Sequence, residues 1–241
     1  MTFGSKSIYS LKIRVTLGVF ERQLREETIL NTAAKVFCAR GFGITKMIHI
    51  AKEAKLSKGL IYFYFKSKDD LYMAVILHAI KRTIQFQKHE MQQHQDLTAL
   101  ERLMKLLEKY FEFVHENPYY QDAISTFISM TNPLKNDNSQ GKLTKGMLES
   151  PFYKQIMEQK FEPFVLITKV LAQGKQDGSI KTNLPPIYLY LSIWSLMIGY
   201  EKLSINDNSG ELEKDNPFFF FSDTQWQDTI KSIVKTILTS P

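Results

Sequence analysis

Residues 45–71 read TKMIHIAKEAKLSKGLIYFYFKSKDDL, and the pattern within this stretch decides the fold. Apolar residues recur at helical spacing on both sides of a polar break, which predicts two short helices joined by a tight turn. Thr45 is expected to cap the first helix, and Ser57 to cap the second, which runs from Lys58 to about Phe65. The buried side of the pair is predicted to consist of Ile48, Ala51, Ala54, Leu56, Ile61 and Phe65.

The same stretch is strongly basic. Residues 45–68 carry six lysines and one acidic residue, Glu53, a net charge of +5. Two helices joined by a short turn are the shape that places a recognition helix in the DNA major groove, which is about 12 Å wide. Flanking lysines can grip phosphates, and the phenolic hydroxyls of Tyr62 and Tyr64 can donate to phosphate oxygens. The stretch therefore indicates a helix-turn-helix that binds DNA.

Three motifs follow one another in this region. Gly41-Phe42 comes after the first predicted helix, I-A-x-x-A begins at Ile50, and S-x-G-x-[LI]-Y-x-[YH]-F-x-[SN]-K begins at Ser57. In this order, over about 45 residues, the set resembles the DNA-binding domain of the TetR family of bacterial transcriptional regulators. The resemblance implies an all-α protein in which an N-terminal three-helix helix-turn-helix DNA-binding domain precedes a larger helical domain that binds a ligand and forms a homodimer.

The resemblance also implies a role for each matched position. The residues that would grip phosphates are Thr45, Lys46, Tyr64 and Lys68. The residues that would face base edges or the wall of the groove are Lys58, Gly59, Leu60, Tyr62 and Phe63, with Lys55 and Ser57 in the turn. Two alternatives stay open at this point: Tyr62 can be a core residue, and any single lysine can be ordinary solvated surface.

Three positions depart from the family pattern. Lys46 stands where a small hydroxyl residue is common, and Lys55 replaces the usual glycine, so a residue with a side chain must occupy that turn. Leu60 replaces a frequent threonine, and it can offer a thymine methyl group an apolar contact in place of a hydrogen bond. These departures leave the fold prediction standing but leave the operator sequence open.

The rest of the chain also reads as helix, without the two-residue alternation of a strand. A first helix is predicted from Glu21 to Arg40, ended by Gly41, and a long fourth one from Ser67 to about Met91. Further helices are predicted at about 96–116, 118–131, 151–173, 186–202 and 224–239, with a loop over 132–150. Two further segments, the loop containing 206–210 and the aromatic run 218–221, precede the last helix.

Charge divides the chain unevenly. Residues 1–68 hold 13 basic and 4 acidic residues, a net charge of +9, whereas the remaining 173 residues hold 18 and 21, a net charge of −3. A basic end favours a polyanionic partner. We expect a basic leader at 1–20, a DNA-binding domain at 21–83 with its motif at about 46–65, and an effector-binding and dimerisation domain at 84–241. The leader is either an unstructured segment or a DNA-contacting arm with the basic residues Lys6, Lys12, Arg14 and Arg22.

Composition narrows the class of protein. The chain has 241 residues, of which 44% are apolar and 23% charged, as in globular proteins. The single cysteine, Cys38, excludes an intrachain disulfide and fits a reducing cytoplasm; we expect it to be a small core residue. The 19 uncharged residues 182–200 contain Pro185 and Pro186, so a helix buried on all sides is favoured there over a membrane span.

The larger domain is expected to hold a mostly apolar or aromatic effector and to form the dimer. The residues proposed for the effector pocket are Phe111, Tyr119, Phe127, Met130, Phe152, Tyr153, Phe161 and Phe164. Those proposed for the dimer interface are Trp194, Met197, Ile198, Trp226, Ile230, Ile233 and Ile237. Aromatic and aliphatic residues at helical spacing are often ordinary core, and that alternative holds for each of them.

No catalytic set, metal site or cofactor is predicted. His89 and His94 are five residues apart, whereas two zinc ligands on one helix face need a spacing of four. We therefore expect a ligand-responsive regulator, most often a repressor in this family, that acts on a pseudo-palindromic operator. The alternatives are a protein-interaction adaptor with a degenerate DNA-binding head and, with less support, a helical enzyme.

Overall fold

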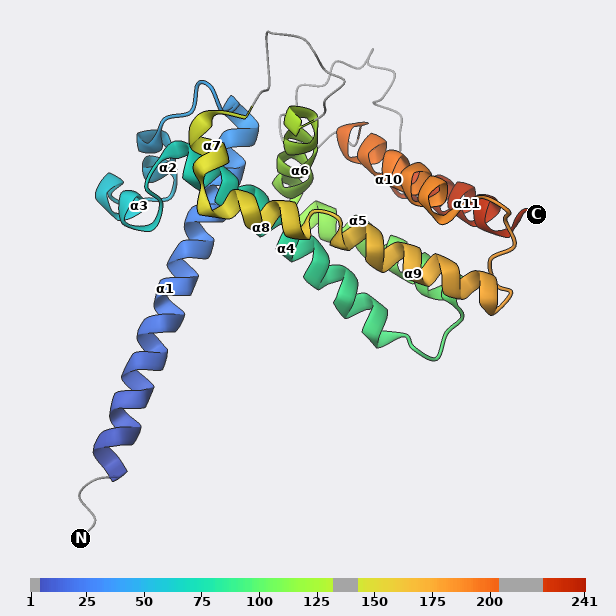
Figure 1. The fold of residues 1–241 in the computed structure, drawn as a ribbon, viewed down its shortest axis with the longest axis horizontal. Helices are drawn as coiled ribbons and strands as arrows, with labels where there is room; N and C mark the ends of the chain where they lie inside the picture. The colour runs from blue at the N-terminus through green and yellow to red at the C-terminus, as the bar shows by residue number, and fades with distance from the viewer. Residues whose placement is uncertain (1–4, 132–142, 204–222) are drawn as a thin grey trace. The chain divides into compact units, whose positions relative to one another are not determined.

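The computed structural model describes residues 5–131, 143–203 and 223–241, and every regular element in these ranges is an α-helix (Figure 1). The first part of the chain holds α1 (Ser5–Arg40), α2 (Met47–Glu53), α3 (Lys58–Tyr64), α4 (Lys68–Gln93), α5 (Ala99–Glu116) and α6 (Pro118–Thr131). The second part holds α7 (Lys145–Glu149), α8 (Pro151–Gln159), α9 (Glu162–Gln176), α10 (Pro186–Leu203) and α11 (Asp223–Thr239). The all-α prediction is confirmed. The predicted segments 206–210 and 218–221 lie outside the described residues.

The chain forms two compact units. Unit 1 consists of residues 1–79 and 122–157, and unit 2 of residues 80–121 and 158–241. The chain passes from one unit to the other inside α4, α6 and α8, so three helices contribute to both. Unit 1 therefore contains the predicted helix-turn-helix together with a segment from the middle of the chain.

Unit 1 is built around the second half of α1 and the first half of α4. Ile29, Ala33 and Phe37 recur at helical spacing and are buried. Tyr72 of α4 lies edge-on to Phe37, with ring centroids 5.0 Å apart. Apolar burial of this kind supplies about 25 cal/mol for each Å² removed from water, which is the main force holding α1 against α4.

Unit 2 has a core drawn from α5, α9, α10 and α11. These helices pack pairwise, α5 on α9 and α11, and α10 on α9 and α11. Their buried residues form one cluster, which includes Leu103, Leu107, Phe111, Val170, Leu171, Leu189, Met197, Tyr200, Ile230, Val234 and Leu238. The predicted last helix, α11, therefore packs its apolar side inside its own unit.

Several helix ends differ from the prediction. The first helix begins at Ser5 and not at Glu21, so it includes most of the predicted leader. Lys46 and not Thr45 precedes α2, and its backbone N–H donates to His49 Nδ1 at 3.2 Å. Thr98 and not Asp96 caps α5, through a capping box in which Glu101 accepts from the Thr98 backbone at 2.9 Å.

Two further differences lie after α6. The five-residue α7 occupies part of the stretch predicted as a loop, and Thr144 caps it. The single helix predicted over 151–173 is two helices, α8 and α9. Pro163 lies in the first turn of α9, where its missing N–H costs nothing, so a helix begins there more easily than one continues through it.

Three burial predictions are wrong. Ile48 is 50% exposed, because Met47, Ile50 and Ala51 form the buried side of α2. Cys38 is exposed, since it follows the buried Phe37 and a helix turns by about 100° per residue. The helix predicted as buried on all sides, α10, exposes one apolar face in the single chain. Among the helices in the described ranges, none has the length and apolar character needed to cross a membrane.

Candidate nucleic-acid interface

The α2–α3 pair forms a helix-turn-helix whose turn is held by backbone hydrogen bonds. Leu56 N–H donates to the Ala51 carbonyl at 2.9 Å, and Ile50 on α2 and Ile61 on α3 are fully buried. Lys55 lies in the turn with φ = +55°, the left-handed region that glycine occupies without cost. The prediction that a residue with a side chain occupies this turn is confirmed.

The second helix, α3, begins as the sequence predicts. Ser57 caps it, since its Oγ accepts a hydrogen bond from the Leu60 N–H at 3.1 Å. Phe65 and Ile61 point into unit 1 and are buried. The opposite face is open: Phe63 is 70% exposed and Tyr62 is 43% exposed. Tyr62 is therefore a surface residue, which settles the alternative that the sequence left open.

Around this open face lie side chains that can meet a polyanion. Lys46, Lys55, Lys58, Gly59 and Ser57 are exposed, whereas Leu60 and Tyr64 are partly buried. Lys58 Nζ lies 5.6 Å from the Tyr62 ring centroid, so the charge sits over an aromatic face. An exposed aromatic surface flanked by lysines fits the floor and walls of a DNA groove.

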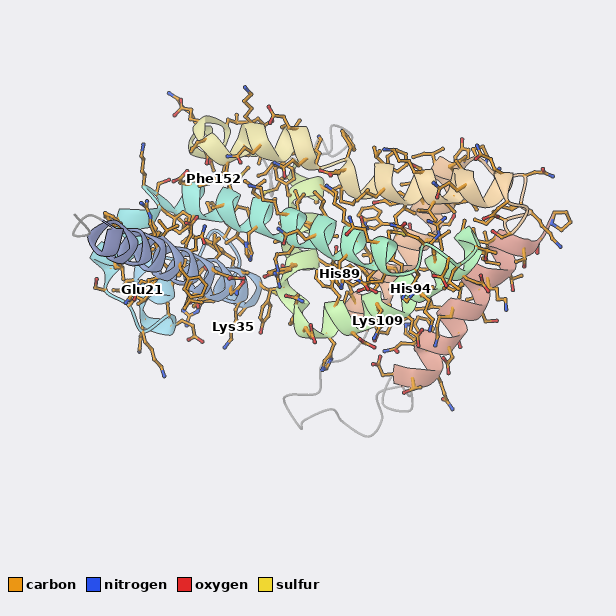
Figure 2. All side chains as sticks on the ribbon, turned by 90° about the horizontal axis from the view of Figure 1, so that it is seen from below. Glu21, Lys35, His89, His94, Lys109 and Phe152 are labelled. Carbon is orange, nitrogen blue, oxygen red and sulfur yellow. The ribbon has the colours of Figure 1, made fainter. Side chains whose placement is uncertain are left out.

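The one acidic residue of the motif is paired with a lysine of the same unit. Glu53 on α2 forms an ion pair with Lys35 on α1, with Nζ and Oε1 3.0 Å apart. This hydrogen bond lowers the pKa of Glu53. Figure 2 labels Lys35 on α1. Because its charge is paired, Glu53 repels phosphate less than a free carboxylate would.

Two predicted phosphate ligands are used within the fold. Thr45 is buried, and its hydroxyl donates to the Gly41 carbonyl at 2.8 Å. Lys68 Nζ donates to the Phe42 carbonyl at 2.8 Å and the Gly43 carbonyl at 3.4 Å, and lies 4.2 Å from the Phe42 ring centroid. Both residues fasten the segment between α1 and α2. Their contact with DNA stays a prediction.

Arg22 is not among the residues that the family pattern assigns to DNA binding. Its guanidinium carbon lies 5.9 Å from the Phe63 ring centroid and 6.0 Å from that of Tyr64. Phe63 and Tyr64 end α3, so an arginine of α1 stacks beside the last turn of this helix. The sequence marks Arg22 only as one of four basic residues of a possible DNA-contacting arm.

A second set of contacts ties residues 143–157 to the start of α4, within unit 1. Ser150 Oγ donates to Asp70 Oδ1 at 2.8 Å in a buried position, and the Thr144 hydroxyl bonds to Asp69. Phe152 on α8, labelled in Figure 2, lies with its ring centroid 6.3 Å from that of Phe65. The residues just beyond α3 are therefore clamped by a segment that lies more than 70 positions further along the chain.

The predicted effector-pocket residues are divided between the units. Unit 1 contains Phe127, Met130, Phe152 and Tyr153, and unit 2 contains Phe111, Tyr119, Phe161 and Phe164. Phe111 belongs to the core of unit 2 and lies edge-on to Tyr200, 4.8 Å between centroids, while Phe161 is 62% exposed. The structure does not gather the eight residues into one unit, and their role in a pocket stays a prediction.

A polar cluster in unit 2 is not evident from the sequence. The Tyr110 hydroxyl donates to Glu201 Oε1 at 3.0 Å and accepts a hydrogen bond from Gln121. Burial, then the Glu201 charge, raises the pKa of Tyr110 well above 10. Tyr190 lies edge-on to Phe164 with centroids 5.0 Å apart, and burial raises its pKa to about 12. Three different helices meet at Tyr110, and no motif links these positions.

The predicted dimer residues fall into two groups. Met197 and Ile230 are buried in the core of unit 2, with Trp226 and Ile237 packed against it. Ile233 on α11 is 40% exposed, and Trp194 and Ile198 on α10 are partly exposed. Ile187 and Leu191 extend the α10 pair into a stripe at spacings of four, three and four residues, and both are more than 40% exposed.

Metal chemistry finds no support in the described ranges. No group of three or more potential ligands from His, Cys, Asp and Glu is present there. Figure 2 labels His89 near the end of α4 and His94 just beyond that helix.

The sequence comparisons match mainly the helix-turn-helix region of the chain. A family profile described as "Bacterial regulatory proteins, tetR family" matches residues 29–75. The uncharacterised HTH-type transcriptional regulator YuxN of Bacillus subtilis is 39% identical over 59 residues, 24% of this chain and 20% of YuxN. The chain thus spans about a fifth of the length of this relative. The fatty acid metabolism regulator protein of B. subtilis is 24% identical over 157 residues, 65% of this chain and 71% of that protein.

Solved structures resemble most of the chain in fold. FadR of B. subtilis in complex with stearoyl-CoA superposes with a TM-score of 0.58 at 18% identity, covering 88% of this chain and 98% of FadR. AibR in complex with isovaleryl coenzyme A and operator DNA gives a TM-score of 0.60 at 18% identity, covering 87% and 97%. At this identity the likeness shows the fold: a helix-turn-helix head followed by a larger helical part.

Proposed function

We propose, from the premise that this chain belongs to the TetR family of bacterial regulatory proteins, that it regulates transcription by binding operator DNA through α3. The observation that carries the proposal is the open face of α3. Phe63 and Tyr62 are exposed there, although monomeric proteins rarely leave neighbouring large aromatic side chains uncovered. Lysines surround them, and the only acidic residue of the motif is paired.

The proposed contacts follow from exposure. Lys58, Gly59, Tyr62 and Phe63 face base edges or the groove wall, with Leu60 beside them at the start of the helix. Lys46, Lys55 and Tyr64 meet phosphates, and the Ser57 backbone fixes the turn. The proposed role of Thr45 is to stabilise unit 1, because its hydroxyl proton is already donated to the Gly41 carbonyl. The Lys68 ammonium group donates to two carbonyls, and its third N–H can donate to a phosphate.

We further propose that the protein works as a homodimer on a pseudo-palindromic operator. The exposed α10 stripe is a candidate for the shared surface, since Ile187, Leu191, Trp194 and Ile198 line one side of that helix. Two recognition helices held about 34 Å apart meet successive major grooves on one side of the duplex. Met197 and Ile230 are covered by their own chain and lie outside the proposed interface.

The proposed effector is an acyl-coenzyme A or a related molecule with a largely apolar part. FadR and AibR, which share the fold, were solved with stearoyl-CoA and isovaleryl coenzyme A. Binding of the effector would shift the population of head spacings and release DNA, as in a repressor. A cytoplasmic, non-enzymatic regulator is the corresponding expectation for location and class.

Fluorescence anisotropy tests the DNA-binding proposal. Purified protein is titrated onto labelled DNA from beside its own coding region and onto scrambled DNA of equal length, at about 50 and 200 mM salt, with random-site selection if neither binds. We expect preferential binding that weakens steeply with salt, because phosphate contacts release counterions. Equal weak binding to all DNA, with no sequence enriched by selection, would favour an adaptor with a degenerate head.

Variants separate the assigned roles. Lys46→Ala and Tyr64→Phe should weaken binding to every sequence, whereas Leu60→Ala should change which operator variant is preferred. Lys169→Ala on α9 is the control for loss of one exposed positive charge. If the control weakens binding as much as Lys46→Ala, the phosphate assignment is wrong. Stearoyl-CoA and isovaleryl-CoA are then added to the complex, and release of the labelled operator by either one supports the effector class.

A further inference from the structure

A segment from the middle of the chain packs against the corner between α3 and α4. This corner consists of residues 65–70 and follows directly after the last residue of the recognition helix. Residues 144–152, which contain α7, Ser150 and the start of α8, contact the corner within unit 1. We call residues 144–152 the brace. Because α3 joins the corner at its C-terminal end, a segment that holds the corner also holds that end of α3.

Asp70 is the residue at which the corner and the brace meet. It is 8% exposed, and its two carboxylate oxygens accept hydrogen bonds from two different segments. Oδ2 accepts from the Lys66 backbone N–H at 3.2 Å, within the corner, and Oδ1 accepts from Ser150 Oγ at 2.8 Å, in the brace. The Asp70 backbone N–H also donates to Ser67 Oγ at 3.0 Å. One buried carboxylate therefore ties the corner to the brace.

The hydroxyl of Ser150 is oriented by its own segment. Its Oγ accepts a hydrogen bond from the Phe152 N–H at 3.3 Å while it donates to Asp70. Ser150 is 7% exposed, so water has little access to this hydrogen bond. Removing one partner of a buried hydrogen bond to a charged group leaves the other partner unsatisfied, which costs more than the bond itself contributes. The Ser150 hydroxyl is therefore the most sensitive point of the brace.

Packing contacts accompany this hydrogen bond. Phe65 of the corner is almost fully buried, and its ring centroid lies 6.3 Å from that of Phe152, which Figure 2 labels. The backbone of α7 also comes close to α4. A Cβ added to Gly146 would lie 3.0–3.2 Å from three side-chain atoms of Asp69, whose carboxylate accepts a hydrogen bond from the Thr144 hydroxyl. The fit between α7 and α4 leaves little room for another methyl group.

We propose that the brace is a positioning element for the recognition helix, with Ser150 as its central residue. Ser150 acts through Asp70, and Phe152 acts through Phe65, without contacting DNA. This inference rests on the proposed DNA binding by α3 and adds to it residues from the middle of the chain. A head whose brace is weakened stays folded but holds α3 in its binding-competent position for a smaller fraction of the time. The apparent dissociation constant for the operator rises as that fraction falls.

Operator titrations of the full chain test the role of Ser150. Ser150→Ala removes the donor to Asp70 and should weaken operator binding about three- to tenfold. The slope of log K against log salt should equal that of the parent protein, because no phosphate contact is lost. Ser125→Ala is the matched control, since this hydroxyl also lies in unit 1 but donates to the Asp122 carbonyl of its own helix. The control should bind as the parent does.

Gly146→Ala disturbs the same contact without removing a hydrogen-bonding group. The added methyl group would press on Asp69, so α7 and α4 must move apart. We expect a loss of operator affinity similar to that of Ser150→Ala, again with the parent salt slope. The control is Gly199→Ala on α10, where an added Cβ meets nothing within 4 Å. It should keep the parent affinity.

Hydrogen exchange measured by mass spectrometry distinguishes positioning from a general loss of stability, and it needs no DNA. In Ser150→Ala, the amides of residues 58–66 should exchange faster, whereas those of residues 29–37 on α1 should keep the parent rate. Equal acceleration in both segments would overturn the proposal, because the brace would then merely stabilise unit 1.

Parent affinity of Ser150→Ala for the operator would also overturn the proposal. A smaller salt slope in that variant would do the same, since it would make Ser150 a direct phosphate contact. If the parent protein binds no operator, the proposed function fails. In that case the exchange rates of residues 58–66 still decide whether the brace holds α3.

Discussion

At the scale of single residues, the most unusual position is Lys55. Its φ of +55° places a long side chain in a backbone conformation that costs a non-glycine residue about 1 kcal/mol or more. The charge is held where the proposed phosphate contacts begin, so the strain accompanies a proposed DNA-binding position.

Two variants of Lys55 distinguish the effect of its backbone strain on stability from the effect of its charge. Lys55→Gly should raise the free energy of unfolding by about 0.5 kcal/mol, because relief of the left-handed conformation exceeds the extra entropy of glycine in the unfolded chain. Lys55→Ala removes the same charge but keeps the strain, and it should not stabilise. Urea unfolding measures both. Equal stabilisation in the two variants would mean that charge repulsion, and not φ, is relieved.

Buried tyrosines predict an alkaline limit to stability. Burial raises the pKa of Tyr72 and Tyr190 to about 12 in the folded chain, whereas an unfolded tyrosine titrates near 10. The folded state therefore binds more protons above pH 10. The free energy of unfolding should fall there by about 1.4 kcal/mol per pH unit for each tyrosine, until about pH 12.

Unfolding between pH 9 and 11 checks this. Tyr72→Phe and Tyr190→Phe should each flatten the decline, since both keep the ring and lose the titrating hydroxyl. Tyr188→Phe, at a 60% exposed position, is the control and should leave the slope unchanged. A decline as steep in all three variants as in the parent would assign it to other groups.

Sequence reasoning at this scale worked where a residue's role is local. Ser57 as a cap, Gly41 as a helix end and Phe65 as core could be predicted, because each depends on neighbours within a few positions. Arg22 could not, since it meets α3 about 40 residues further along the chain. Thr45 is an exception, because its hydroxyl donates to the Gly41 carbonyl only four positions earlier, although the sequence suggests a helix cap.

At the scale of whole helices, glycine shows how position decides the effect of one methyl group. Gly18 lies within α1, and an added Cβ would meet nothing within 4 Å. In α9, a Cβ on Gly174 would lie 2.4–3.1 Å from three atoms of Ile180, including its Cβ, which cannot move without the backbone. Gly18 therefore only weakens its helix, whereas Gly174 lies so close to Ile180 that the position needs glycine.

The two alanine variants should therefore change stability in opposite directions. Gly18→Ala should strengthen the helical signal in circular dichroism, because alanine favours helix by about 1 kcal/mol. Gly174→Ala should lower the free energy of unfolding by about 1–3 kcal/mol through overpacking. Thermal unfolding of both proteins measures the contrast. A stable Gly174→Ala variant would mean that the α9–α10 connection yields easily.

Helix types were predictable from periodicity, but several ends were not. The capping box of Thr98 and Glu101 is visible in the sequence, yet Asp96 competes with it two positions earlier. The short α7 lies in a polar stretch whose pattern resembles a loop, and its anchors, Asp69 and Asp70, are far away in the chain. Such elements form through tertiary contacts and leave little periodic signal.

At the scale of the whole molecule, the α10 stripe makes a prediction about assembly. Leu191→Lys places a charge among Ile187, Trp194 and Ile198, where burial against a second copy would strand it. The protein should shift from dimer toward monomer in sedimentation velocity. Leu184→Lys, a similarly exposed leucine before α10, is the control and should remain dimeric. A dimer unaffected by Leu191→Lys would place the interface elsewhere.

The contacts of Ser150 with Asp70 and of Phe152 with Phe65 have a consequence for protein engineering. The simplest chimera would join this head to another protein's larger domain at a single cut just after α3 or within α4. Here a fragment ending near residue 83 would leave Asp70 without Ser150 and Phe65 without Phe152. A transplant of this head that is to keep its native support must therefore carry residues 143–157 with it, as a second graft taken from the middle of the chain.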